Sequence, residues 1–156
     1  MCVLKVSNLC KKFNNQEVLK NVSFSVKRGE VIAIIGPSGS GKSTLLRCII
    51  KLEDVDRGTI EIDGRPLVVE NESGVPVYSS EKEIRQLRLK MGMVFQNFNL
   101  FPHMSVLENI IEAPMIVNRM PRSQAERIAE ELLAKVGLDN KRNNYPYELS
   151  GGQKQR

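Results

Sequence analysis

The chain has 156 residues, which suits one ordinary domain or most of a larger one. Hydrophobic residues make up 41% and charged residues 26%, a composition that excludes a disordered chain and indicates a globular one. The net charge of +5 comes from Lys and Arg residues mixed among acids. Solvated surfaces therefore explain it better than a nucleic-acid partner does.

The longest strongly apolar run, residues 31–35, is far too short to span a bilayer. The first residues lack the basic segment and apolar core of a secretory signal. Three cysteines at irregular spacing, Cys2, Cys10 and Cys48, indicate reduced thiols in a cytoplasmic protein. We expect all three to be small, buried hydrophobic side chains.

The first third of the chain predicts strands. Residues 21–26 alternate, with Val22, Phe24 and Val26 on one face. The β-branched run at 31–35 suits a strand that is buried on both faces. Residues 58–64 alternate again, with Ile60 and Ile62 inward and a turn at Asp63–Gly64, and residues 65–80 suggest a small hairpin or a surface excursion.

The second half predicts a charged helix at 81–91, a short strand at 92–96 and a loop at 97–105. A helix follows at 106–117, and Pro114 is expected to bend or interrupt it. The pattern of elements as a whole indicates a mixed α/β protein.

The next helix is predicted to begin with a capping box formed by Ser123 and Glu126 and to end at Gly137. Its expected buried stripe consists of Ala125, Ile128, Ala129, Leu132 and Val136.

A glycine-rich segment matches the phosphate-loop pattern G-x-x-x-x-G-K-[ST] in full. Its glycines let backbone N–H groups point at a polyphosphate, and the helix that begins near Lys42 adds the positive end of its dipole. Lys42 would neutralise the β- and γ-phosphates, and the Ser43 hydroxyl would ligate Mg²⁺. The sequence therefore predicts nucleotide binding by Gly36, Pro37, Ser38, Gly39, Ser40, Gly41, Lys42, Ser43 and Thr44.

A serine and two glycines near residue 150 predict a second anion site, because they expose backbone N–H groups at a helix start. An ordinary serine cap would explain any two of these residues. Together with the phosphate loop, the whole segment resembles the signature motif of ATP-binding-cassette (ABC) ATPases. This signature segment consists of Leu149, Ser150, Gly151, Gly152 and Gln153.

Two further residues resemble family positions. Gln96 matches the Q-loop glutamine, which in the family reaches Mg²⁺ and the attacking water. Phe13 matches the aromatic residue that stacks on adenine; the family more often has tyrosine there, and core packing is the competing interpretation. The resemblance runs from about Leu4 to Arg156.

The resemblance implies an α/β fold: a P-loop NTPase core of the ABC type with an N-terminal antiparallel β subdomain and a helical subdomain. The β subdomain and core would occupy about residues 1–96 and the helical subdomain about 97–156, with the C-terminal part of the core missing. The segment 98–117 and the excursion after Gly64 look most like ATPase subunits of polar amino-acid uptake systems.

The resemblance also implies the cofactors ATP and Mg²⁺ and a head-to-tail pair of ATPase subunits. Ser150, Gly151 and Gly152 of one subunit would contact ATP held at the partner's Lys42. Phe98, Leu100 and Phe101 would receive a membrane permease subunit, and an extracytoplasmic solute-binding protein would act indirectly. The protein would lie on the cytoplasmic face of the membrane and would bind no nucleic acid.

In the family, the Walker B aspartate, the glutamate after it and the switch histidine all follow the signature motif. Asp63 ends a strand too early to be that aspartate, and His103 precedes the signature motif. We therefore expect a chain that binds nucleotide, hydrolyses almost none and exposes an unpaired apolar edge beside residues 31–35. The alternatives are an ABC-type ATPase acting on DNA or ribosomes and a non-catalytic nucleotide-binding fragment.

Overall fold

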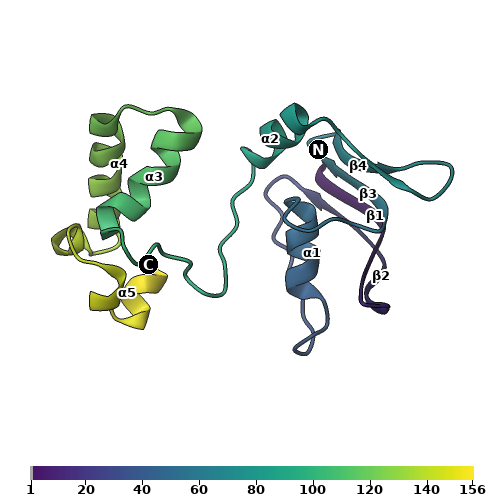
Figure 1. Ribbon diagram of the computed structural model, residues 1–156, viewed down its shortest axis with the longest axis horizontal. Coiled ribbons are helices and arrows are strands. Elements are labelled where there is room, and N and C mark those ends of the chain that lie inside the picture. Colours follow the sequence, from purple (N-terminus) through teal and green to yellow (C-terminus); the bar gives the residue numbers. More distant parts are fainter. Residues whose placement is uncertain (1) are drawn as a thin grey trace. The chain divides into compact units, whose positions relative to one another are not determined.

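The computed structural model describes residues 2–156, which divide into two compact units, one ending at Gly92 and one beginning at Met93 (Figure 1). The first unit contains five strands and two helices: β1 (Cys2–Phe13), β2 (Gln16–Lys27), α1 (Lys42–Ile49), β3 (Arg57–Ile62), β4 (Arg65–Glu70), β5 (Pro76–Tyr78) and α2 (Glu81–Arg88). The second contains α3 (Val106–Asn118), α4 (Arg122–Lys135), two short 3-10 turns (Asp139–Lys141 and Pro146–Glu148) and α5 (Gly151–Gln155).

The strands form one antiparallel sheet in the order β2-β1-β3-β4-β5. Asn14 and Asn15, with φ of 46° and 65°, join β1 to β2. Asp63 and Gly64, with φ of 49° and 72°, join β3 to β4. Positive φ at both central residues is the type I′ geometry that matches the twist of paired strands. The turn predicted at Asp63–Gly64 is therefore confirmed, as is the hairpin expected within residues 65–80, formed by β4 and β5.

The core of the first unit lies between the sheet and the helices α1 and α2. Residues from all three contribute, together with Val55 from the connection between α1 and β3: Val6, Leu9, Leu19, Leu45, Cys48, Ile49, Val55, Ile60, Ile62, Leu67, Val68, Ile84 and Leu87. Val22, Phe24 and Val26 are half-buried while Asn21, Ser23 and Ser25 are exposed, so the alternation predicted for 21–26 is confirmed. All three cysteines are free thiols, but only Cys48 is buried. Cys10 is half-buried and Cys2 is exposed, so the expected burial of these two was wrong.

Two predicted strands are absent from the described chain. Residues 30–38 and 91–95 form no regular structure. Val31 and Ile35 are each 93% exposed and Val94 is 96% exposed, against the expectation that residues 31–35 are buried on both faces. A strand is stable only when its N–H and C=O groups pair with a neighbour, and residues 2–156 supply none for these segments. Because residues 31–35 form no strand here, the unpaired strand edge expected beside them is not present in this structure, and the apolar side chains of the run are themselves exposed.

In the second unit, α3 and α4 pack through Leu107, Ile111, Ala125 and Ala129. The helix α3 runs through Pro114 without interruption, contrary to the alternative that Pro114 breaks it. Proline removes a single intrahelical hydrogen bond, and burial of one face of α3 offsets that loss.

The predicted start of α4 was wrong. The helix begins at Arg122 with Pro121 as N-cap, and no side chain of the described residues caps it. Ser123 lies inside the first turn, and Glu126 pairs with Arg122 at 2.7 Å instead of closing a capping box. The buried stripe includes Leu133, whereas Leu132 is 45% exposed.

Gly137, with φ of 67°, follows the last turn of α4 as predicted. Within residues 2–156, no helix combines the length and apolar character needed to cross a membrane.

Candidate nucleotide-binding site

The phosphate loop leads into α1 at Gly41, which serves as the N-cap with φ of 89°. A Cβ atom at this position would lie 2.9 Å from the carbonyl oxygen of Val18 and 3.0 Å from Cδ2 of Leu19, both in β2. Only glycine combines this backbone conformation with such a close approach. The β1–β2 hairpin therefore fixes the start of the helix that would face the phosphates.

The side chain of Lys42 folds back onto its own loop. Its Nζ atom donates hydrogen bonds to the carbonyl oxygens of Gly36 at 2.8 Å and Pro37 at 2.7 Å, and lies 3.4 Å from Oγ of Ser40. These contacts hold the ammonium group over the loop. A phosphate group would meet a positive charge already in position.

The first turn of α1 fits an anion. The helices α2, α3 and α5 are each closed by a serine capping box, from Ser80, Ser105 and Ser150. By contrast, no side chain of the described residues caps α1, and its first turn carries no acidic residue. The free N–H groups and the helix dipole suit a phosphate, and the exposed hydroxyl of Ser43 is available to a cation bound beside it.

Phe13 lies at the end of β1, opposite Gln16 and next to the Asn14–Asn15 turn. Its side chain is 40% exposed and belongs to none of the core clusters of residues 2–156, which argues against the core-packing interpretation. The ammonium of Lys11 lies 5.0 Å from the centroid of the ring. The ring is thus partly exposed and has the Lys11 ammonium over one face.

The signature segment is held by its leucine and its serine. Leu149 is buried with Val106, Leu133 and Leu138. The Oγ atom of Ser150 accepts a hydrogen bond from the backbone N–H of Gln153 at 3.3 Å, and Oε1 of Gln153 accepts one from the N–H of Ser150 at 2.8 Å.

An added Cβ at Gly151 or Gly152 would meet no described atom within 4 Å. Both glycines are therefore open at the helix start, as predicted.

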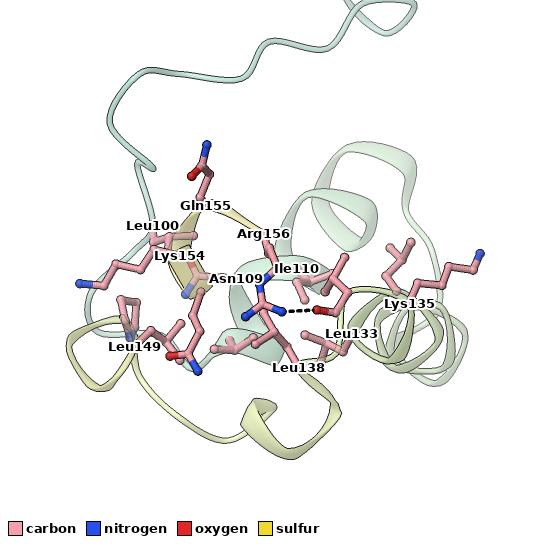
Figure 2. Close-up of a pocket in the computed structure, with 15 residues that line it drawn as sticks. Leu100, Asn109, Ile110, Leu133, Lys135, Leu138, Leu149, Lys154, Gln155 and Arg156 are labelled. Carbon is pink, nitrogen blue, oxygen red and sulfur yellow. Dashed lines mark hydrogen bonds between the residues drawn. The ribbon is translucent and has the colours of Figure 1, made fainter. Parts of the chain in front are cut away.

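A cavity of about 480 Å³ lies beside the signature segment in the second unit. Figure 2 shows its walls, formed by apolar side chains such as Leu133, Leu138 and Leu149, with Arg156 donating a hydrogen bond to the carbonyl oxygen of Val136 at 2.7 Å. Its lining surface is mostly apolar, which suits a polyphosphate poorly, although Lys135, Lys154 and Arg156 also line it. The chemistry expected for a nucleotide lies at the phosphate loop instead.

The aromatic loop, residues 97–105, is fixed by one side chain that the sequence analysis missed. Oδ1 of Asn109 accepts a hydrogen bond from the N–H of Phe101 at 2.8 Å, and Nδ2 donates to the carbonyl oxygens of Phe101, Met104 and Ser105 at 2.9–3.1 Å. Asparagine in the first turns of a predicted helix carries no sequence signal for such a role. Phe98 and Phe101 are 45% and 50% exposed.

The same end of α3 holds the segment before the signature. The N–H of Val106 donates to the carbonyl oxygen of Asn144 at 2.8 Å, and that of Leu107 to Arg142 at 2.9 Å. These bonds satisfy helix N–H groups that otherwise have no partner. The aromatic loop and the signature segment are therefore anchored on one helix start.

Two predicted site residues belong to the second unit. Gln96 is exposed and belongs to the second unit, whereas the phosphate loop and Phe13 belong to the first. Leu100, predicted with Phe98 and Phe101 to face a permease, is half-buried and lines the cavity beside the signature.

Comparison with known sequences decides the family. A profile described as ABC transporter matches residues 19–156. The chain belongs to the ABC transporter family. Similar ABC proteins include the L-cystine transport system ATP-binding protein TcyN of Escherichia coli, 53% identical over 156 residues. The glutamine transport ATP-binding protein GlnQ of E. coli is 46% identical over 154 residues.

The chain is covered fully by the alignment to TcyN but spans 61% of that relative, and it spans 60% of GlnQ. Among solved structures, it resembles a dimeric ATP-binding cassette in a post-hydrolysis state bound to ADP and phosphate. The TM-score is 0.79 at 35% identity, over 97% of this chain and 65% of that one. The expected ABC fold, present in part with its antiparallel sheet and helices, is thus confirmed.

Proposed function

We propose that this chain is the ATP-binding subunit of an importer for a polar amino acid, and that ATP binding and hydrolysis drive uptake in the complete system. The observation that carries the proposal is the phosphate loop, in which Lys42 is held over the loop by Gly36 and Pro37 before an uncapped helix start. Relatives named for transport of cystine, arginine, glutamine and glutamate support the solute class.

ATP would lie with its phosphates on residues 36–44 and its base on Phe13. The N–H groups at the start of α1 and the ammonium of Lys42 would bind the β- and γ-phosphates. Ser43 and Gln96 would hold Mg²⁺, which when bound neutralises charge that develops on the phosphate oxygens. Gln96 would also orient the attacking water.

A second ATPase subunit would complete the site. Ser150, Gly151 and Gly152 would contact the γ-phosphate of ATP bound to the partner's Lys42. No described atom crowds the two glycines, while the Ser150 hydroxyl accepts a hydrogen bond from the N–H of Gln153 in this structure. Similarity to a dimeric cassette supports this pairing.

Phe98, Leu100 and Phe101 would contact an integral permease subunit. Phe98 and Phe101 carry this proposal, since exposed aromatic side chains commonly anchor interfaces, whereas Leu100 is half-buried. The extracytoplasmic solute-binding protein would act through that permease, and the chain would lie peripherally on the cytoplasmic face of the membrane. Asn109 would keep this loop in one conformation for docking.

For the 156-residue polypeptide itself, we propose ATP binding with almost no hydrolysis. Family members carry the Walker B aspartate, the general-base glutamate and the switch histidine after the signature motif, and these 156 residues include no match to them. Removal of a positioned base typically costs a factor of about 10² to 10⁴ in rate.

The test uses the purified polypeptide with Mg²⁺ and ATP. Calorimetric titration should show binding that Lys42→Ala weakens strongly, and a phosphate-release assay should show no turnover above the rate of the Lys42→Ala variant. Absence of binding by the parent chain would refute the proposed ATP site. Turnover that depends on Lys42 would refute the proposed lack of hydrolysis while leaving the ATP site intact.

A further inference from the structure

We propose that Lys11 is a positioning residue for the base-binding face of Phe13: its ammonium group holds one face of the ring and leaves the opposite face for adenine. The inference rests on the proposed binding of ATP and deepens it. It assigns a role to a charged side chain that lies outside the phosphate loop and the signature segment.

Among residues 2–156, Lys11 is the one buried charged residue, with 7% of its surface exposed. Its Nζ atom lies 3.2 Å from Oε1 of Glu53 and 3.5 Å from Oδ1 of Asp56. Asp56 is itself fixed, because its Oδ2 accepts a hydrogen bond from the N–H of Lys12 at 2.6 Å and its N–H donates to the carbonyl oxygen of Cys10 at 3.0 Å. A buried ammonium needs such partners, and here they also set its position.

The same ammonium faces the ring of Phe13, with Nζ 5.0 Å from the centroid. This distance is within the range of about 6 Å at which a cation is attracted to the face of an aromatic ring. The ring is 40% exposed, and with the ammonium over one face, the opposite face is the one that the proposal assigns to the base. Lys11 therefore both orients the ring and selects the face that a base can stack on.

Lys11 also ties the ring to the phosphate loop. In the strand register Lys11 lies opposite Leu19, whose Cδ2 atom is within 3.0 Å of the Cβ position at Gly41. At the other end of α1, the N–H of Glu53 donates to the carbonyl oxygen of Arg47 at 3.3 Å. The base side and the phosphate side of the candidate site are thus linked through contacts of β1, β2 and α1.

The side chain of Lys11 carries at neutral pH the positive charge that its contact with the Phe13 ring requires. Burial favours the neutral amine of Lys11, but the hydrogen bonds and negative charges of Glu53 and Asp56 outweigh it, so the pKa is raised above 10.5.

The chain offers a matched control. Lys51 forms an ion pair with Asp54, and its Nζ atom lies 4.0 Å from the centroid of the Tyr78 ring. This pair repeats the lysine–carboxylate–aromatic arrangement in the same unit without involving Phe13. Changing Lys51 therefore removes an equivalent interaction away from the proposed base contact.

The experiment compares Mg²⁺-dependent binding of ATP and of inorganic tripolyphosphate, which carries no base, to the full 156-residue chain. Lys11→Met should weaken ATP binding about five- to tenfold, in the range expected for lost base stacking, and leave tripolyphosphate binding within twofold. Phe13→Leu should do the same, and Lys11→Met should add nothing in the Phe13→Leu background. Lys51→Met should change neither ligand more than twofold.

Lys11→Met leaves two carboxylates without a cation, so a second variant, Lys11→Met with Glu53→Gln and Asp56→Asn, removes the charges together. It should show the same selective loss of ATP. An unchanged ATP affinity in folded Lys11 variants, with Phe13→Leu impaired, would overturn the positioning role but not the ATP site. An equal loss of both ligands, or failure of both Lys11 variants to fold, would make Lys11 a general structural residue and also overturn the proposal. No effect of Phe13→Leu would instead remove the proposed base contact itself.

Discussion

The Nζ atom of Lys42 lies 2.8 Å from the carbonyl oxygen of Gly36, so the phosphate loop holds its own lysine in place. Lys42→Ala removes a charge-assisted contact worth about 2 kcal/mol, and ATP affinity should fall at least about 30-fold. Calorimetric titration with Mg²⁺ and ATP measures this loss. Lys90→Ala, which removes an ion pair with Asp63 in the same unit, should leave ATP affinity within twofold.

Gly41→Ala should destabilise the protein by about 2–3 kcal/mol, because the new Cβ would be strained at φ of 89° and would lie 2.9 Å from the carbonyl oxygen of Val18. Gly39→Ala is the matched control, with φ of 80° but no described atom within 4 Å of the new Cβ, and should cost only about 1–2 kcal/mol. Urea unfolding without nucleotide measures both. Equal losses would show that the contact with β2 is unimportant.

Ser150→Ala should remove the cap of α5 and cost about 1 kcal/mol in the stability of the second unit. If Ser150 also contacts ATP on a partner, the variant should lose ATP-induced association, measured by sedimentation velocity with Mg²⁺ and ATP. Ser105→Ala removes an equivalent cap from α3 and should cost similar stability without a specific loss of association. Equal association by the two variants would contradict the contact across the dimer.

Asn109→Ala should loosen the aromatic loop, because four hydrogen bonds to residues 101–105 disappear together. We expect faster hydrogen exchange at the Phe101 amide and a loss of about 1–2 kcal/mol in stability. Asn109→Asp keeps the oxygen acceptor for Phe101 and should slow that exchange relative to Asn109→Ala. Exchange as slow in Asn109→Ala as in the parent would refute the role of this side chain.

Alkaline pH should destabilise the first unit. Burial raises the pKa of the Cys48 thiol to about 11 and that of the Tyr78 hydroxyl to about 12. Below its unfolded-state pKa, each group is neutral in both the folded and the unfolded protein, and its contribution to stability is fully present. As pH rises from the unfolded-state pKa through the folded-state pKa, the unfolded protein ionises first and this contribution is lost. Stability should therefore decline between about pH 9 and 12, and the decline should be shallower in Cys48→Ala. Thermal melts across this range provide the measurement, and a parallel decline in both proteins would contradict the assignment to Cys48.

Local patterns predicted much of the fold. Period-two alternation placed Ile60 and Ile62 inward, Asp63–Gly64 marked a hairpin turn, and the phosphate-loop letters located the start of α1 at Lys42. These features depend on neighbours close in sequence, which a sequence displays directly.

What failed depends on distant partners. The run at 31–35 has the composition of a buried strand, but strand formation needs a paired neighbour, and residues 2–156 supply none. Ser123 and Glu126 fit a capping box, yet the N-cap is Pro121, two residues earlier, and Glu126 pairs with Arg122. The roles of Lys11 and Asn109 could not be predicted because each arises from contacts with segments folded against it.

The Asn14–Asn15 turn restricts the number of residues in this hairpin more than it restricts their types. Phe13 pairs with Gln16 across a two-residue connection, and side chains alternate between the faces of a strand. An aromatic exchange such as Phe13→Tyr would keep the ring on its present face, whereas one residue inserted or deleted before Phe13 in β1 would turn it to the opposite face. This end of the hairpin should therefore tolerate substitutions but not insertions or deletions in β1 before Phe13.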